Sequence, residues 1–107
     1  MKIKINPISI NKCFQGRRFK TPLYKAWREE FGYKIKTDLK DLEPKFVKLV
    51  FGVKNFKMAD LDNMVKATLD SLTETGVIKD DRFIERLLLE KKKVEKKEDE
   101  YIEITFY

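Results

Sequence analysis

Alternating apolar and polar residues predict three strands. The first covers residues 2–6 and ends at Pro7, the second covers residues 45–54, and the third covers residues 100–107. A side-chain period of two places the apolar residues of a strand on one face, where they can meet a core. The residues in these positions are Ile3 and Ile5, then Val47, Leu49, Phe51 and Val53, then Ile102, Ile104 and Phe106.

The first predicted helix begins at the threonine-proline pair of residues 21–22. Threonine is a preferred N-cap residue and proline fits the first helical position, so the pair marks a helix start. Leu23, Trp27 and Phe31 then recur every four residues and give the helix one apolar face. Gly32 can end this helix in a left-handed cap.

A second helix is predicted over residues 61–74, and Gly76 stops it. Its apolar stripe consists of Leu61, Val65, Leu69 and Leu72. Residues 83–98 are ambiguous, because their Leu, Glu, Lys and Arg content favours helix by propensity. The same segment shows neither a helical stripe nor the alternation of a strand.

Length and composition indicate one domain, residues 1–107. The chain is 42% apolar and 39% charged, which is typical of a globular domain, and its small core would gain stability from a dimer interface. The longest apolar runs, such as residues 87–89, are too short for a transmembrane helix. The N-terminus shows no signal-peptide pattern, so we expect a cytoplasmic protein that is not bound to a membrane.

The chain has one cysteine, Cys13, and no histidine. A structural zinc site usually needs four Cys or His ligands, and Ser–His or Cys–His catalysis needs an imidazole, so both are excluded. Residues 1–57 hold 15 Lys or Arg against 5 Asp or Glu, whereas residues 58–107 hold 9 against 13. A basic half and an acidic half suggest a phosphate-binding surface beside a carboxylate site, although many small proteins are basic.

Aspartates lie before and after the second predicted helix. Asp60 and Asp62 lie where an extended segment enters the helix, and Lys66 follows one turn after Asp62 on the same face. The turn at Gly76 could return Asp80 and Asp81 to the same end of the helix. Converging carboxylates repel one another, and a divalent cation relieves that repulsion; magnesium prefers such oxygen ligands and can activate water beside a scissile phosphate.

Each of these residues, taken singly, also has an ordinary structural role. An aspartate at a helix start usually caps free backbone amides, and Asp62 and Lys66 have the spacing of a common surface ion pair. Asp70 lies two turns from the helix start, so we expect it to be solvated or locally paired and not a metal ligand. An isolated Asp-x-Asp therefore predicts little by itself.

The longer string is more specific. The residues DLDNMVKATLDSLT at 60–73, followed by GVIKDD at 76–81, resemble the signature of the RusA family of Holliday junction resolvases. Asn11, the basic loop after it and the helix around Trp27 resemble the family's N-terminal region more loosely. The resemblance favours a hairpin in which residues 83–98 lead into the last strand. The expected order is strand, helix, strand, helix, strand, strand, an α/β two-layer domain with a four-stranded mixed sheet.

The resemblance implies a homodimer that binds four-way DNA junctions and cuts two strands symmetrically, with Mg2+ as cofactor and Mn2+ as an alternative. Carried over to this chain, it implies that Asp60, Asp62 and Asp81 bind the metal and that Lys66 is the catalytic lysine. Asp80 matches a neighbouring acidic position. All four principal residues are then expected to be catalytic.

One position departs from the family pattern. Ala59 stands where members often have a basic residue directly before the first aspartate. Lys57 or Lys54 could supply the charge, but each would have to reach from a different place.

Cations and aromatic residues are interleaved in the loop before the first helix. Lysine and arginine neutralise phosphates, and unstacked bases near a branch point can lie on Phe14 or Phe19. Packing under the first helix is an equally good expectation for Phe19. The residues expected to contact DNA are Lys12, Phe14, Arg17, Arg18 and Lys20.

The leading hypothesis is a magnesium-dependent endodeoxyribonuclease that resolves four-way junctions by paired nicks, in recombination and repair. Two alternatives stay open. One is a non-catalytic module that binds branched DNA, which the alanine at position 59 leaves open. The other is a nuclease that acts on flaps or structured RNA.

Overall fold

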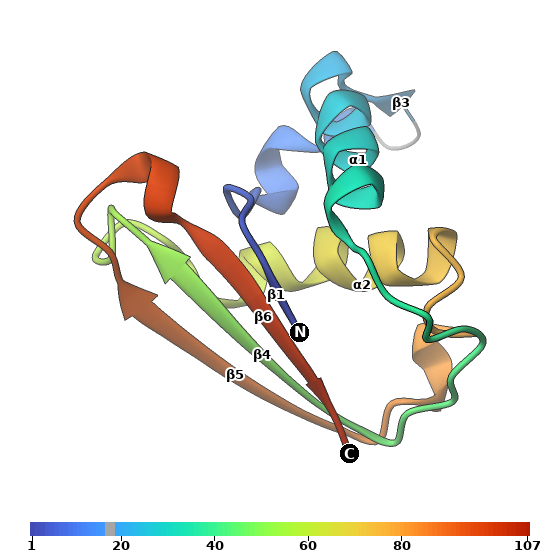
Figure 1. Cartoon of the computed structure of the whole chain (residues 1–107). Helices are drawn as coiled ribbons and strands as arrows, with labels where there is room; N and C mark the ends of the chain where they lie inside the picture. The colour runs from blue at the N-terminus through green and yellow to red at the C-terminus, as the bar shows by residue number, and fades with distance from the viewer. Residues whose placement is uncertain (17–18) are drawn as a thin grey trace.

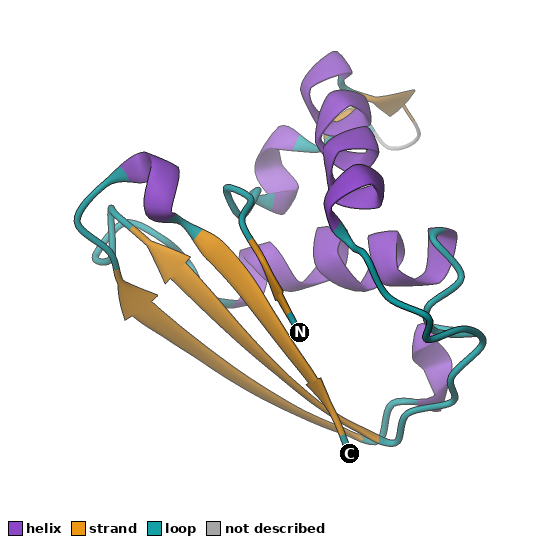
Figure 2. Ribbon diagram, in the orientation of Figure 1, coloured by secondary structure: helices purple, strands orange, loops and turns teal. Residues whose placement is uncertain are grey.

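The computed structural model describes residues 1–16 and 19–107. One layer is a four-stranded sheet and the other consists of helices on one side of it (Figure 1). The sheet strands are β1 (Lys2–Ile3), β4 (Phe46–Val53), β5 (Arg86–Lys93) and β6 (Tyr101–Phe106), and the helices are α1 (Pro22–Lys34) and α2 (Val65–Glu74). Strands β2 (Phe14–Gln15) and β3 (Phe19–Lys20) form a separate antiparallel pair. The predicted mixed α/β architecture is confirmed (Figure 2).

Four short 3-10 helices connect these elements in the described part of the chain. They are η1 (Ile10–Lys12), η2 (Asp62–Met64), η3 (Asp81–Phe83) and η4 (Lys97–Asp99). Two of them, η2 and η3, begin at aspartates of the predicted site. No helix in the described ranges is long and apolar enough to cross a membrane.

The strand order in the sheet is β1-β6-β4-β5. Strand β4 pairs in parallel with β5, with Val47 opposite Leu87, and antiparallel with β6, with Leu49 opposite Ile104. The expected hairpin between β5 and β6 is therefore wrong, because β4 lies between them. The reason is burial: residues 49–53 of β4 are buried without interruption, so this strand takes the centre of the sheet and has partners on both sides.

The first strand is shorter than its alternation predicts. Only Lys2 and Ile3 join the sheet, although Ile5 is also buried. The chain leaves the sheet because Asn6 makes other contacts: its carbonyl accepts a hydrogen bond from Trp27 Nε1 at 2.6 Å, and its side-chain amide donates to the Lys97 carbonyl at 2.9 Å. The start of the chain is thus fixed to α1 and to the loop before β6.

Helix α1 begins as predicted, with Thr21 Oγ1 accepting a hydrogen bond from the Tyr24 amide at 3.1 Å. Its end and its buried face differ from the prediction. The helix continues past Gly32 to Lys34. Its buried residues are Tyr24, Trp27 and Phe31, whereas Leu23 is 56% exposed.

Helix α2 follows directly from η2, and Gly76 ends the segment with a φ of +80°, as the sequence predicts. The buried stripe is shifted from the expected one. Leu72 is buried as predicted, but Leu61, Val65 and Leu69 are only half-buried at the edge of the core. The other buried positions are Met64, Ala67, Thr68 and Ser71. Small and hydroxyl side chains fit here because the Thr68 hydroxyl donates to the Met64 carbonyl within the helix, at 3.0 Å.

Candidate functional site

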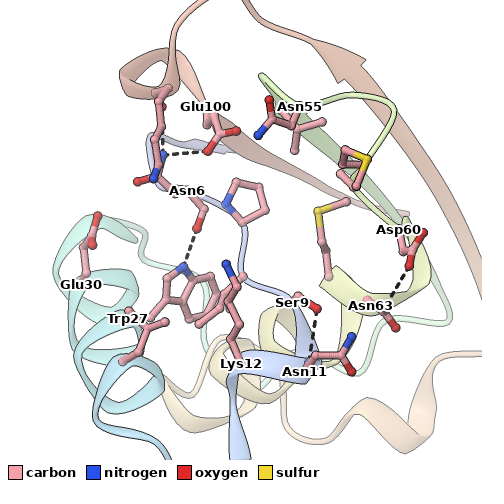
Figure 3. A pocket seen from close by; sticks show the side chains of 18 of the residues that line it. Asn6, Ser9, Asn11, Lys12, Trp27, Glu30, Asn55, Asp60, Asn63 and Glu100 are labelled. Atoms are coloured by element: carbon pink, nitrogen blue, oxygen red, sulfur yellow. Dashed lines mark hydrogen bonds between the residues drawn. The ribbon is translucent and has the colours of Figure 1, made fainter.

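Asp60 lies on the segment that enters η2, and its side chain is exposed. Asn63 Nδ2 donates to Asp60 Oδ2 at 3.2 Å, and the Asn63 amide donates to the Asp60 carbonyl at 3.1 Å (Figure 3). The structure gives no side-chain cap at the start of η2 or of α2. The carboxylate of Asp60 therefore faces solvent and does not serve as the helix cap that its position in the sequence allows.

Asp62 is the first residue of η2 and is exposed. The ion pair between Asp62 and Lys66 that their spacing allows does not form. Lys66 Nζ instead lies 3.4 Å from Asp70 Oδ2, one turn further along α2. Asp70 is thus locally paired, as predicted, and the carboxylate of Asp62 remains directed to solvent.

Asp80 and Asp81 lie at the start of η3, beyond the turn at Gly76. Backbone hydrogen bonds from Leu42 to Val77 (3.0 Å) and from Lys79 to Leu42 (2.8 Å) hold this segment against the chain before β4. The Asp80 carboxylate accepts a hydrogen bond from the Arg82 amide at 3.0 Å, which is the main reason that the pKa of Asp80 is lowered.

Asp81 is half-buried in a crowded acidic environment. Burial raises the pKa of its carboxyl above the ordinary value, and the hydrogen bond with Asp80 and the negative charges of Asp70 and Asp80 raise it further. Lys66 is the positive group that opposes this shift. The fold therefore brings Asp81 to Lys66 and Asp70 on the side of α2, as the sequence anticipates for Asp81 and Lys66.

The structure does not bring all three predicted metal ligands into one group. Across residues 1–16 and 19–107, no three acidic, Cys or His residues are close enough to hold a metal ion together. Asp60 and Asp62 lie by η2, and Asp81 lies with Asp70 and Asp80. The donor set nevertheless suits magnesium, because every donor is a carboxylate oxygen and the negative charge around Asp81 is only partly balanced.

A cleft of about 550 Å3 opens beside Asp60. Of the predicted metal ligands it touches only Asp60, which lies at its edge with Asn63 (Figure 3). Lys12 and Asn11 line it from η1, and Trp27 lines it from α1. The cleft thus connects the Asp60 side of the site with the predicted DNA-binding loop.

That loop contains the β2–β3 pair. Phe14 is half-buried, with its ring edge-on to Tyr24 and the ring centroids 5.5 Å apart, and Lys20 lies opposite it in the pair. Lys12 and Lys20 are exposed. Phe19 is 73% exposed, so it does not pack under α1. Arg17 and Arg18 lie outside the described residues.

One basic residue near Asp60 was not anticipated. Lys91 extends from β5, and its Nζ donates to the Phe56 carbonyl at 2.5 Å and to the Ala59 carbonyl at 2.9 Å. Neither Lys57 nor Lys54 makes this contact. The sequence does not show which of the three lysines at 91–93 faces the site, because the direction of each side chain depends on how β5 pairs with β4.

Comparison with known proteins identifies the family of the chain. No curated protein matches the sequence. A family model described as endodeoxyribonuclease RusA matches residues 10–106, which is nearly the whole chain and includes every aspartate discussed above. The chain therefore belongs to the RusA family of endodeoxyribonucleases.

Proposed function

We propose that this protein is a magnesium-dependent endonuclease that resolves four-way DNA junctions as a homodimer, by a pair of symmetric nicks. Membership of the RusA family supports the nuclease class and a junction substrate. The observation that carries the proposal is the half-buried Asp81, which lies within electrostatic reach of Asp70, Asp80 and Lys66. An acidic group of this kind beside a lysine suits a cation and a phosphate.

Asp60, Asp62 and Asp81 would hold the cation in this proposal. A bound Mg2+ supplies a water of lowered pKa and charge stabilisation at the scissile phosphate. Asp60 and Asp62 are exposed, so they can meet a hydrated ion without first being desolvated. Asp81 provides the fixed ligand, because η3 and the turn at Gly76 determine its place beside α2.

Lys66 would act on the phosphate. Its side chain is 60% exposed and its only ion pair among the described residues is the long one with Asp70, so it can turn toward an incoming phosphate at low cost. Asp70 keeps the ammonium group near Asp81 until DNA arrives. The lysine then balances negative charge that develops in the transition state.

Lys91 would position Asp60. Its two hydrogen bonds hold the carbonyls of Phe56 and Ala59, and Ala59 directly precedes Asp60. The positive charge that many relatives have directly before the first aspartate would thus come from a neighbouring strand here. Because Lys91 can supply this charge, Ala59 is a weaker argument for a DNA-binding module without catalytic activity.

The DNA would lie along the basic loop and the cleft. Lys12, Lys20, Arg17 and Arg18 would neutralise phosphates, and Phe14 would meet an unpaired base near the branch point. The contact of Phe14 with Tyr24 supports this role, because it fixes the ring in place before DNA binds.

The test is incubation of the protein with a synthetic four-way junction and Mg2+, with flap, duplex and structured RNA substrates in parallel. Paired nicks in the junction are expected, and the variant Asp81→Asn should bind the junction but not cut it. Parental cutting by Asp81→Asn would contradict the assignment of Asp81. If the parent binds the junction but does not cut it at any enzyme concentration, the protein is the non-catalytic binding module instead. If the parent cuts flaps or structured RNA in preference to the junction, the proposed four-way-junction substrate is wrong.

A further inference from the structure

The cleft beside Asp60 contains large apolar side chains that the fold leaves uncovered. Leu23 lines it from the start of α1 and is 56% exposed, and Met58 lines it from the loop after β4 and is 82% exposed. Trp27 also lines it, and a hydrogen bond from its ring nitrogen to the Asn6 carbonyl fixes the ring in place (Figure 3). A concave site with apolar walls and a few polar groups is typical of a site that binds a small, flat ligand.

Two side-chain amides of the cleft are free to bind such a ligand. Asn55 and Asn11 lie at opposite ends of the cleft in Figure 3, and in the described part of the chain neither side-chain amide makes a hydrogen bond. Asn6 differs from them, because its amide already donates to the Lys97 carbonyl and to Glu100. A side-chain amide has donors and an acceptor, and it can pair with the edge of a nucleobase, which has both as well. The free amides therefore favour a nucleobase over a purely apolar ligand.

The charges that line the cleft leave two cations available for phosphate. Besides Asp60, the acidic residues that line it are Glu30, which pairs with a lysine one turn along α1, and Glu100, which accepts two hydrogen bonds. Lys12 and Lys97 also line the cleft, and across residues 1–16 and 19–107 neither forms an ion pair. Lysines without an acidic partner match the phosphates on either side of a bound base.

The size and the place of the cleft also suit one nucleotide. Its volume of about 550 Å3 is within the range of pockets that enclose small ligands. A base must leave its stack to enter a concave site, and this costs least where pairing or stacking is already broken, as at a branch point. Because Asp60 forms the edge of the cleft, a base bound there has its neighbouring phosphate close to the proposed cation.

We infer that this cleft binds one unstacked nucleobase of the strand that is cut. Leu23 and Met58 would cover the faces of the base, and the amides of Asn11 and Asn55 would bind its edge. This base is distinct from the one expected on Phe14, which does not line the cleft. The inference rests on the proposed function for the strand and the phosphate, but base binding can be measured without any cutting.

The first test measures junction affinity by fluorescence anisotropy without Mg2+, with each nucleotide around the branch point replaced in turn by an abasic one. At one position the missing base should weaken binding by the parent at least about threefold. The double variant Leu23→Ala, Met58→Ala should bind the intact junction more weakly, and the same missing base should then cost it less than about twofold, because the two losses are one contact. Both substituted positions are exposed, so the fold should be kept.

Leu39→Ala is the matched control, since Leu39 is 41% exposed on the loop before β4 and does not line the cleft. It should respond to the missing base like the parent. A parent with equal affinity for every abasic junction would overturn the inference, and so would equal losses in the parent and the double variant. A parent that cuts junctions but shows either result would overturn the inference alone, whereas a parent that shows the expected coupling but never cuts would refute the proposed function alone.

The second test locates the base directly. A junction with 4-thiothymidine at the position found in the first test is irradiated with the parent, and the cross-linked peptide is identified by mass spectrometry. The adduct is expected in a peptide that contains Met58, Leu23 or Trp27. An adduct found only in peptides that contain Phe14 or Phe19 would place the base on the loop and overturn the inference.

Discussion

The two halves of the aspartate site differ in how the fold holds them. Asp81 is half-buried, and its pKa is raised by burial and by neighbouring carboxylates. Asp60 and Asp62 are exposed, and the side-chain contact of Asp60 is one hydrogen bond from Asn63. The carboxylate of Asp81 is therefore held in place by the fold before any ligand binds, whereas the carboxylates of Asp60 and Asp62 can still move.

The difference indicates a division of work. In the proposed site, the half-buried carboxylate of Asp81 would determine where a cation binds, since it is already partly desolvated. The exposed carboxylates of Asp60 and Asp62 would add affinity and complete the coordination once the ion and the phosphate are present. Loss of the fixed group should then stop the reaction, and loss of an exposed group should mainly raise the cation concentration that the reaction needs.

The largest effect is expected for Asp81→Asn. Removing the charge of the fixed ligand should lower single-turnover nicking of a four-way junction by at least about a thousandfold. Asp38→Asn, which changes an exposed aspartate on the loop before β4, is the control and should nick like the parent. Junction affinity, measured by gel shift, should be unchanged in both variants. A nicking rate of Asp81→Asn within tenfold of the parental rate would refute the role of Asp81 as the fixed ligand.

Asp60→Asn and Asp62→Asn should each have a smaller effect, of about ten- to a hundredfold at low Mg2+. The physical reason is weaker cation binding, so a large part of the loss should be recovered as Mg2+ is raised. The measurement is the nicking rate as a function of Mg2+ concentration. If neither variant responds to added Mg2+ while Asp81→Asn does, the roles of the two halves are reversed.

Lys66→Met should lower the nicking rate by roughly tenfold or more, because the charge that faces the phosphate is lost. Lys66→Arg keeps the charge but not its compact shape, and should lie between the parent and Lys66→Met. Thermal unfolding is the accompanying measurement, since the exposed pair with Asp70 contributes little stability. A melting temperature that falls sharply in Lys66→Met would show a structural role instead.

The smallest effect is expected for Lys91→Met, at about two- to fivefold in nicking rate, because this lysine acts only by holding the carbonyls before Asp60. Amide hydrogen exchange should rise in residues 56–60 of this variant and not in Lys92→Met, which changes the exposed neighbour on the same strand. Unchanged exchange in residues 56–60 would mean that Lys91 does not order this segment.

The sequence predicts those parts of the fold that depend on local rules. The central strand β4 follows from the apolar residues at every second position from Val47 to Val53, and the start of α1 follows from the cap and the proline. The partner of β5 could not be found in this way, because alternation determines which face is buried but not which strand lies alongside. The shifted stripe of α2 has a related cause: Ala67, Thr68 and Ser71 are buried because small residues allow close packing, and hydrophobicity does not indicate this.

The candidate site was predictable to a similar degree. The turn at Gly76 brings Asp81 back to α2, beside Lys66 and Asp70, but the structure does not group it with Asp60 and Asp62 at the start of the helix, as the turn was expected to do. Asp70 is paired as expected. The partner of Lys66 could not be chosen from the sequence, since spacing alone allows both Asp62 and Asp70. The contact of Lys91 with the segment before Asp60 depends on strand pairing over more than thirty residues of separation, which no local pattern contains.

The central claim is that Asp60, Asp62 and Asp81 share one cation beside a DNA phosphate. The most direct measurement is a crystal structure of the Lys66→Met variant with a four-way junction and Mn2+, in which anomalous scattering locates the metal. We predict one Mn2+ in contact with oxygens of all three aspartates and with a phosphate, with the segment around Asp60 moved toward Asp81. A metal bound only to Asp70, Asp80 and Asp81, with Asp60 and Asp62 still in solvent, would contradict the account.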